Sequence, residues 1–166
     1  MILGMSVEAF TLLHVIISLV AIVAGLALLP AMFASRRSGG LTAVFLATTI
    51  LTSVTGFFFP LKAIGPPHIV GVISLMLLAV ALFALYARRL AGTWRPIYVI
   101  TAIVSLYLNC FVGVVQAFQK IGPLHVLAPK GSEPPFAAAQ GALLIAFAVV
   151  GYLLVRRYRP SAPLAG

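Results

Sequence analysis

Long apolar stretches, separated by short polar ones, occur five times along this chain. Each approaches or exceeds the roughly 20 residues that an α-helix needs to cross the hydrocarbon core of a bilayer. The pattern therefore predicts an all-α fold in which a single transmembrane domain, residues 1–166, forms a bundle of five helices. We expect the spans at about residues 6–33, 41–59, 67–87, 96–119 and 135–155.

Capping and breaking residues set several of these boundaries. Ser6 is expected to cap the first span, and Glu8 falls in its first turn, where the helix dipole favours an acid. Pro30 is expected to bend the last turn of that span, and Pro60 to end the second span. "GPPH" opens the third, with proline in the first turn, where a missing N–H costs nothing.

Composition supports a membrane location. Hydrophobic residues make up 63% of the chain and charged residues 8%, whereas a soluble domain carries about 25% charged residues. The net charge of +9 does not indicate a nucleic-acid-binding protein, because the basic residues lie in short clusters between apolar spans. We interpret them as topology signals.

The basic residues divide unequally between the two sides of the predicted membrane. One side receives all eight arginines: Arg36, Arg37, Arg88, Arg89, Arg95, Arg156, Arg157 and Arg159. The other receives Lys62, Lys120, Lys130, Glu8 and Glu133. By the positive-inside rule, the N-terminus is external and the C-terminus cytoplasmic. Residues 120–134 then form an external loop, and we expect a multi-pass protein of the bacterial inner membrane.

Polar side chains inside the spans form stripes at helical spacing, mostly in the external half. They are Thr11, His14 and Ser18 in the first span, Thr48, Thr52 and Thr55 in the second, Thr101, Ser105, Asn109 and Gln116 in the fourth, and Gln140 in the fifth. Polar groups in a membrane usually face the bundle interior or a cavity. The pattern predicts a polar pocket in the external half, covered by the proline-rich segment 122–135.

Seven residues are candidates to bind a ligand in this pocket, and several have a plainer interpretation. The candidates are His14, His68, Asn109, Gln116, Lys120, Glu133 and Gln140. His14 could instead be a neutral imidazole bonded to Asn109 or to a threonine, and Glu133 could be a helix cap. The threonines could serve only as packing contacts. An alanine stripe in the fifth span (Ala138, Ala142, Ala146) is expected to be a packing face.

Haem b is the specific cofactor hypothesis. His14 and His68, on different helices, could supply both axial ligands, and Lys62 or Lys120 could meet the propionates. The histidines occupy only one end, so a haem would form a single outer centre, which could exchange electrons with a quinol. The four-plus-one helix pattern resembles the cytochrome b561 type of bundle in architecture, without that type's histidine pairs at both ends.

Two other classes of function remain open. One is a small-solute or proton-coupled transporter that uses His14 and Asn109. The other is a non-catalytic accessory subunit whose spans dock onto other membrane subunits or onto a second copy. An enzyme is not favoured, because the chain has no aspartate and no nucleophile–base, H-x-x-x-H or C-x-x-C motif.

One block resembles a signature of small bacterial membrane proteins of unknown activity. It reads "NCFVGVVQAFQKIGPLHVLAPKGSEPPFAAAQ" and spans residues 109–140. The resemblance implies that the polar residues of this block form one constellation on the external side. It brings no activity with it.

Overall fold

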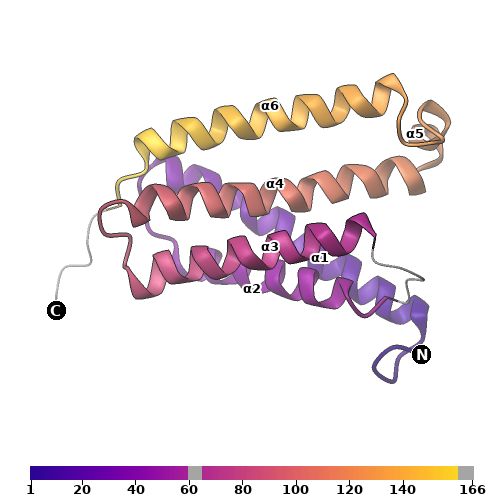
Figure 1. Ribbon diagram of the computed structural model, residues 1–166, viewed down its shortest axis with the longest axis horizontal. Coiled ribbons are helices and arrows are strands. Elements are labelled where there is room, and N and C mark those ends of the chain that lie inside the picture. Colours follow the sequence, from indigo (N-terminus) through magenta and orange to yellow (C-terminus); the bar gives the residue numbers. More distant parts are fainter. Residues whose placement is uncertain (60–64, 161–166) are drawn as a thin grey trace.

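The computed structural model describes residues 1–59 and 65–160, and it is helical along almost all of this length (Figure 1). Five helices in the described part are long and apolar enough to cross a membrane, so the chain is a multi-span membrane protein. The helices are α1 (Val7–Phe33), α2 (Gly39–Gly56), α3 (Pro66–Leu82), η1 (Phe83–Ala87), α4 (Trp94–Lys120), α5 (Gly122–Leu127) and α6 (Pro134–Arg157).

The ends of α1 follow from its sequence. Ser6 caps it as predicted, since its Oγ accepts a hydrogen bond of 3.1 Å from the backbone N–H of Ala9. At the other end Ser35 takes a left-handed conformation with φ 53°, and the N–H of Arg36 reaches back to the carbonyl of Ala31. This closure satisfies carbonyl groups that the last turn of a helix leaves free.

The second and third spans differ from the expected helices. The second span ends as a helix at Gly56, three residues earlier than expected, and residues 57–59 follow in non-helical conformation; Pro60 lies outside the described residues. The third span ends in a π-helical turn, η1, in which the N–H of Arg88 bonds the carbonyl of Phe83 five residues back. Arg89 and Leu90 then take left-handed conformations.

The predicted external loop contains a short helix. The segment between α4 and α6 forms α5 over Gly122–Leu127, which packs on α4. A small cleft of about 140 Å³ lies between the rest of this segment, the end of α4 and Phe136. These contacts hold the segment to α4 and α6, and its role as a cover for a pocket stays a prediction.

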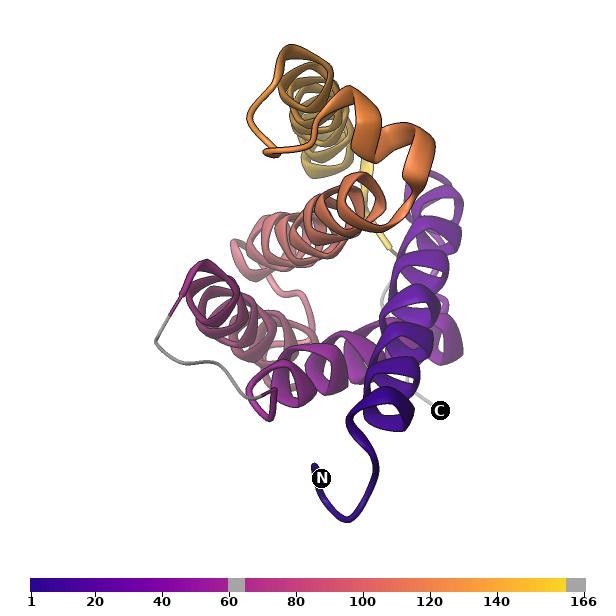
Figure 2. The same ribbon diagram turned by 90° about the vertical axis from the view of Figure 1, so that its right-hand side faces the viewer.

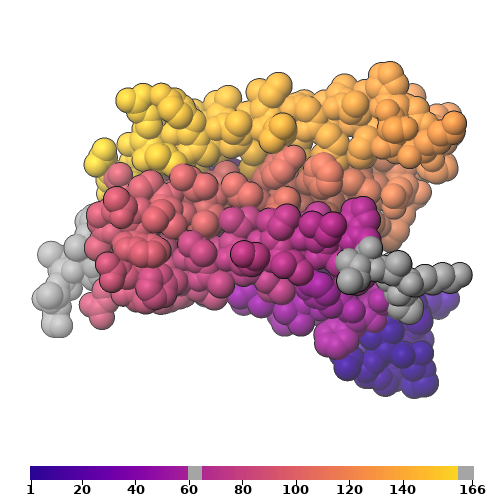
Figure 3. All heavy atoms as spheres, viewed as in Figure 1, coloured from indigo at the N-terminus to yellow at the C-terminus, as the bar shows by residue number. Residues whose placement is uncertain are grey.

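Four helices enclose a common axis, and the fifth long helix lies outside them (Figure 2). Helix α1 contacts α2, α2 contacts α3, α3 contacts α4, and α4 contacts α1. Helix α6 packs almost wholly on α4, on the side away from the other three. In Figure 3 it forms a separate ridge, yellow and orange, along the length of the molecule.

The alanine stripe does not form the packing face of α6. Ala138, Ala142 and Ala146 are all exposed, while Phe147 and Leu154 are buried against the bundle. Large apolar side chains thus make the contact with α4, and the stripe faces outward, because the two sets lie on different sides of one helix.

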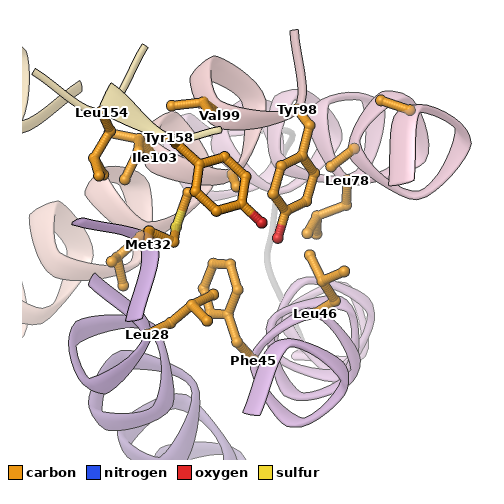
Figure 4. Packing of buried hydrophobic residues seen from close by; sticks show 14 of the residues in the cluster. Leu28, Met32, Phe45, Leu46, Leu78, Tyr98, Val99, Ile103, Leu154 and Tyr158 are labelled. Atoms are coloured by element: carbon orange, nitrogen blue, oxygen red, sulfur yellow. The ribbon is translucent and has the colours of Figure 1, made fainter. Parts of the chain in front are cut away.

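The hydrophobic core fills only one half of the bundle. Tyr98 of α4 is 1% exposed and lies beside Tyr158, with 6.3 Å between the ring centroids. Figure 4 shows both hydroxyl groups pointing toward Phe45 and Leu46 of α2. Other buried members of this cluster, among them Leu28, Met32, Leu78, Val99, Ile103 and Leu154, come from α1, α3, α4 and α6.

Candidate functional site

The charged residues mark two different ends of the bundle. The loops after α1 and η1, the start of α4 and the end of α6 lie together at what we term the arginine end (left in Figure 1). It holds all eight arginines named above. The opposite end, the outer end, holds the N-terminus, the end of α4, α5 and Glu133. The core described above belongs to the arginine half.

His14 of α1 is held by a hydrogen bond from its ring to α2. Its Nδ1 lies 2.7 Å from Oγ1 of Thr55, and that hydroxyl already donates its own proton to the carbonyl of Leu51 at 2.7 Å. The hydroxyl oxygen therefore accepts, and Nδ1 of His14 donates. In this tautomer of the neutral imidazole, Nε2 carries a lone pair that has no hydrogen-bond partner among residues 1–59 and 65–160, and it can accept a hydrogen bond.

An aromatic wall lies beside the His14 ring. Phe59 meets it edge to face, with 5.2 Å between the centroids, and Phe10 packs against Phe59 at 5.2 Å. Phe10 is 2% exposed. The imidazole thus combines one fixed polar contact with apolar neighbours.

Side-chain hydrogen bonds deeper in the bundle join α2 to its neighbours. Nδ2 of Asn109 on α4 donates to Oγ1 of Thr49 at 3.2 Å. One turn further along the same side of α2, the hydroxyl groups of Ser53 and Ser74 lie 3.1 Å apart. Asn109 therefore bonds a threonine, and it is not the partner of His14.

The hydroxyl of Thr52 differs from most others in the spans. Eight hydroxyl groups donate to a carbonyl of their own helix: Thr11, Ser18, Thr48, Thr49, Ser53, Thr55, Thr101 and Ser105. Oγ1 of Thr52 is buried and has no hydrogen-bond partner in the described part of the chain. Thr52 lies one turn from Thr55 on the same side of α2. A buried hydroxyl without a partner costs free energy, which a bound ligand could recover.

The side chains along one face of α4 become more exposed toward the outer end. Ser105 is fully buried, Asn109 is half-buried, Val112 is 37% exposed and Gln116 is exposed. These residues follow one another at spacings of three or four, so they share a face, and that face turns toward α2 where Asn109 bonds Thr49. The neighbouring helices therefore leave this face accessible above Asn109.

His68 differs from His14 in its hydrogen bond and in its aromatic neighbour. Its Nδ1 accepts a 3.3 Å hydrogen bond from the backbone N–H of Gly65, so in this neutral tautomer Nε2 carries the proton. Its ring packs on Phe57, with 5.7 Å between centroids, whereas His14 packs on Phe59. The two rings therefore have different hydrogen-bond partners and different aromatic neighbours, and their pairing as axial ligands of a haem stays a prediction.

The remaining candidates are scattered. Lys120 is exposed at the end of α4. Nε2 of Gln140 donates to the carbonyl of Phe111 at 3.1 Å, which joins α6 to α4 and leaves its buried Oε1 without a partner among the described residues. Lys62 lies outside the described residues.

Glu133 closes the loop that precedes α6. Its two carboxylate oxygens each accept a hydrogen bond of 3.0 Å, from the backbone N–H groups of Lys130 and Ser132. Desolvation would raise the pKa of this carboxyl, but the bonds from these N–H groups and the Lys130 charge outweigh it and lower the pKa. The side chain has no bond to the first turn of α6, so it stabilises the loop.

The structure thus brings His14 together with two residues that were not among the candidates, Thr55 of α2 and Phe59 just after it. The stripe of Thr48, Thr52 and Thr55 was visible in the sequence, but its partner helix was not. No group of three or more histidine, cysteine, aspartate or glutamate side chains that could hold a metal ion occurs in the described ranges.

Comparison with known proteins gives no match to a family model, to a curated protein or to a solved structure.

Proposed function

We propose that the outer half of the bundle binds a small, membrane-soluble molecule that carries a hydroxyl group, with a quinol as the chemical class that fits best. The observation that carries this proposal is the hydrogen bond between Nδ1 of His14 and Thr55, which leaves Nε2 without a partner in the described part of the chain, beside an aromatic wall. A quinol hydroxyl can donate to Nε2 while its ring packs against Phe59. The membrane that fits the arginine asymmetry and the resemblance in residues 109–140 is the bacterial inner membrane.

Thr52 supports the proposal independently. Its buried hydroxyl lies one turn of α2 below Thr55, the residue that holds the His14 ring. A ligand oxygen placed between His14 and α2 could use the hydroxyl as a donor or an acceptor. The exposed face of α4 at Val112 and Gln116 gives such a ligand a route to the site from the outer end.

The closed core favours binding over transport. Transport through the bundle would need a path through the arginine half, where Phe45, Leu46, Leu78 and Tyr98 are each 1–2% exposed. Interiors packed in this way leave no passage for a solute without rearrangement of the helices. A site reached from the outer end alone needs no such rearrangement.

Equilibrium binding of a short-chain quinol to the protein in lipid nanodiscs tests this function. The wild type is expected to bind the quinol more tightly than the matching quinone, because only the quinol can donate to Nε2. His14→Ala should weaken quinol binding by roughly tenfold, the equivalent of one hydrogen bond. The matched control is His125→Ala, which removes an exposed histidine at the same end and should bind like the wild type.

Thr52→Val keeps the test decisive if His14→Ala does not fold. Valine has nearly the shape of threonine and removes the unpartnered hydroxyl, so the free protein should be as stable as the wild type or more stable. Quinol binding should nevertheless weaken. The proposal is wrong if the wild type binds neither quinol nor quinone, or if both variants bind the quinol as the wild type does.

A further inference from the structure

The arginine end has a large positive charge and no acidic side chain to balance it. Both glutamates of the chain, Glu8 and Glu133, lie at the outer end. Two of the eight arginines rest on aromatic rings, Arg88 on Trp94 and Arg156 on Tyr152. The anions that neutralise the other guanidinium groups are therefore not side chains of this protein.

The segment at the end of α6 is fixed across this end by hydrogen bonds to the α1–α2 turn and to the start of α4. The hydroxyl of Ser35 donates to the carbonyl of Arg157 and accepts from the N–H of Arg159, each at 3.0 Å. From the start of α4, Nη1 of Arg95 donates to the carbonyl of Tyr158 at 3.2 Å. Residues 157–159 thus form a strap that joins the α1–α2 turn to the start of α4.

The strap completes an open cleft of about 390 Å³. Its walls are Leu90 and Gly92, from the turn after η1, together with Arg95, the strap residue Arg159 and the following Pro160. Leu90 and Gly92 both have positive φ, which folds this turn tightly beside α4. Two guanidinium groups from different parts of the chain therefore line one cleft.

Within the described ranges, both guanidinium groups have most of their N–H donors without a hydrogen-bond partner. Arg95 uses one N–H group for the strap, and Arg159 contacts Ser35 through its backbone only. A guanidinium has five N–H donors in a planar fork, which matches the oxygens of a phosphate. The cleft is thus suited to a phosphate group held from two sides.

Aromatic residues place the cleft at the level of lipid head groups. Tyr86 and Tyr152 are 60% and 58% exposed on the sides of the spans that end here, and Trp94 is half-buried at the start of α4. Exposed tyrosine and tryptophan side chains concentrate at the interface between the hydrocarbon core and the head groups. A phosphate at this depth belongs to a phospholipid.

We propose that the cleft formed by Leu90, Gly92, Arg95, Arg159 and Pro160 binds the head-group phosphate of an anionic phospholipid. The lipid bridges the strap and α4, and its negative charge offsets part of the arginine cluster. Basic pockets between membrane helices bind anionic lipids by this charge pairing. The proposal does not depend on the ligand site at the outer end.

Native mass spectrometry of the detergent-purified chain, titrated with phosphatidylglycerol or phosphatidylcholine, tests this site. The wild type is expected to bind one phosphatidylglycerol molecule more tightly than any phosphatidylcholine. Arg95→Gln with Arg159→Gln should weaken phosphatidylglycerol binding by on the order of tenfold. The charge-matched control, Arg36→Gln with Arg156→Gln, removes two exposed arginines that do not line the cleft and should keep the wild-type preference.

Arg159→Gln alone covers the case in which the double variant does not fold, because it removes no hydrogen bond of the strap. It should still weaken phosphatidylglycerol binding. Equal losses in the cleft and control variants would show non-specific charge attraction and overturn the proposal. Displacement of the lipid by millimolar inorganic phosphate would also overturn it, since the occupant would then be a soluble phosphate.

Discussion

Hydroxyl groups in the spans divide into those that bond their own helix and the few that reach another. The first kind, such as Thr48 and Thr101, donates to a carbonyl one turn back in the same helix. Such a bond does not depend on how the helices pack. The second kind, such as Ser74, which meets Ser53, joins two helices. Thr55 does both, and for that reason it fixes the proton of His14 on Nδ1.

The residue scale also gives a prediction about pH. Because hydrogen bonds lower the pKa of Glu133 below its ordinary value of 4.5, its contribution to the loop is fully present above that value. The contribution is lost as the pH falls through the lowered pKa of the folded state. We expect the hydrogen-exchange protection of the Lys130 and Ser132 amides to be constant near neutral pH and to fall below about pH 4.

Two variants test whether Glu133 causes the loss of amide protection at low pH. Glu133→Gln should reduce the protection of both amides at neutral pH and remove the acid dependence. Glu8→Gln, which changes the only other acidic residue, should leave both unchanged. Protection that falls with pH in the Glu133→Gln protein would mean that another group closes the loop.

At the scale of helices, the apolar pattern predicted all five spans to within three residues at each end. The pattern succeeds because span length is set by the bilayer and span ends by local groups such as Ser6. The π-helical turn at residues 83–87 and the short helix α5 were not predicted. Both depend on packing against α4, and the sequence of either segment alone does not contain that contact.

Close helix packing at Gly25 gives a prediction at this scale. A Cβ atom on Gly25 would lie 2.9 Å from two ring atoms of Phe45 and closer still to Cδ1 of Leu106. Gly25→Ala should therefore lower the free energy of unfolding by about 1–3 kcal/mol, the usual cost of overpacking. Gly141→Ala is the matched control, because its Cβ would meet nothing within 4 Å.

Unfolding by a denaturing detergent in mixed micelles measures both glycine variants against the wild type. Gly141→Ala should leave the free energy of unfolding unchanged or raise it by up to about 1 kcal/mol, because alanine forms helix better than glycine. If Gly25→Ala is as stable as the wild type, α1 packs less closely on α2 and α4 than described.

The two halves of the molecule along its long axis differ in packing and in the charged residues they carry. One half contains the main buried cluster and the arginines, and the other contains Lys120, Lys130 and the residues around His14. The sequence predicted which residues share an end, because the order of the spans determines this. It could not pair His14 with Thr55 or separate His14 from His68, because those contacts depend on the rotation of each helix.

The orientation of this axis in the membrane gives a testable prediction. With the N-terminus external, Lys130→Cys should react with a membrane-impermeant thiol reagent added to intact cells. Arg36→Cys should react only after the membrane is permeabilised. Both substitutions belong in a Cys110→Ala background, which removes the one native thiol and should itself remain unlabelled. The reverse labelling pattern would show that the N-terminus is cytoplasmic and the C-terminus external.

The strap has a consequence for the order of events during biosynthesis. Residues 157–159 leave the ribosome after all five spans, yet they bond to Ser35 and Arg95, which are made much earlier. The first four spans already contact one another in a closed circuit, so they can associate before α6 is complete. The strap then forms after these contacts. Newly made chains in which residues 157–159 have not yet bonded to Ser35 and Arg95 are therefore the ones that membrane quality control would encounter.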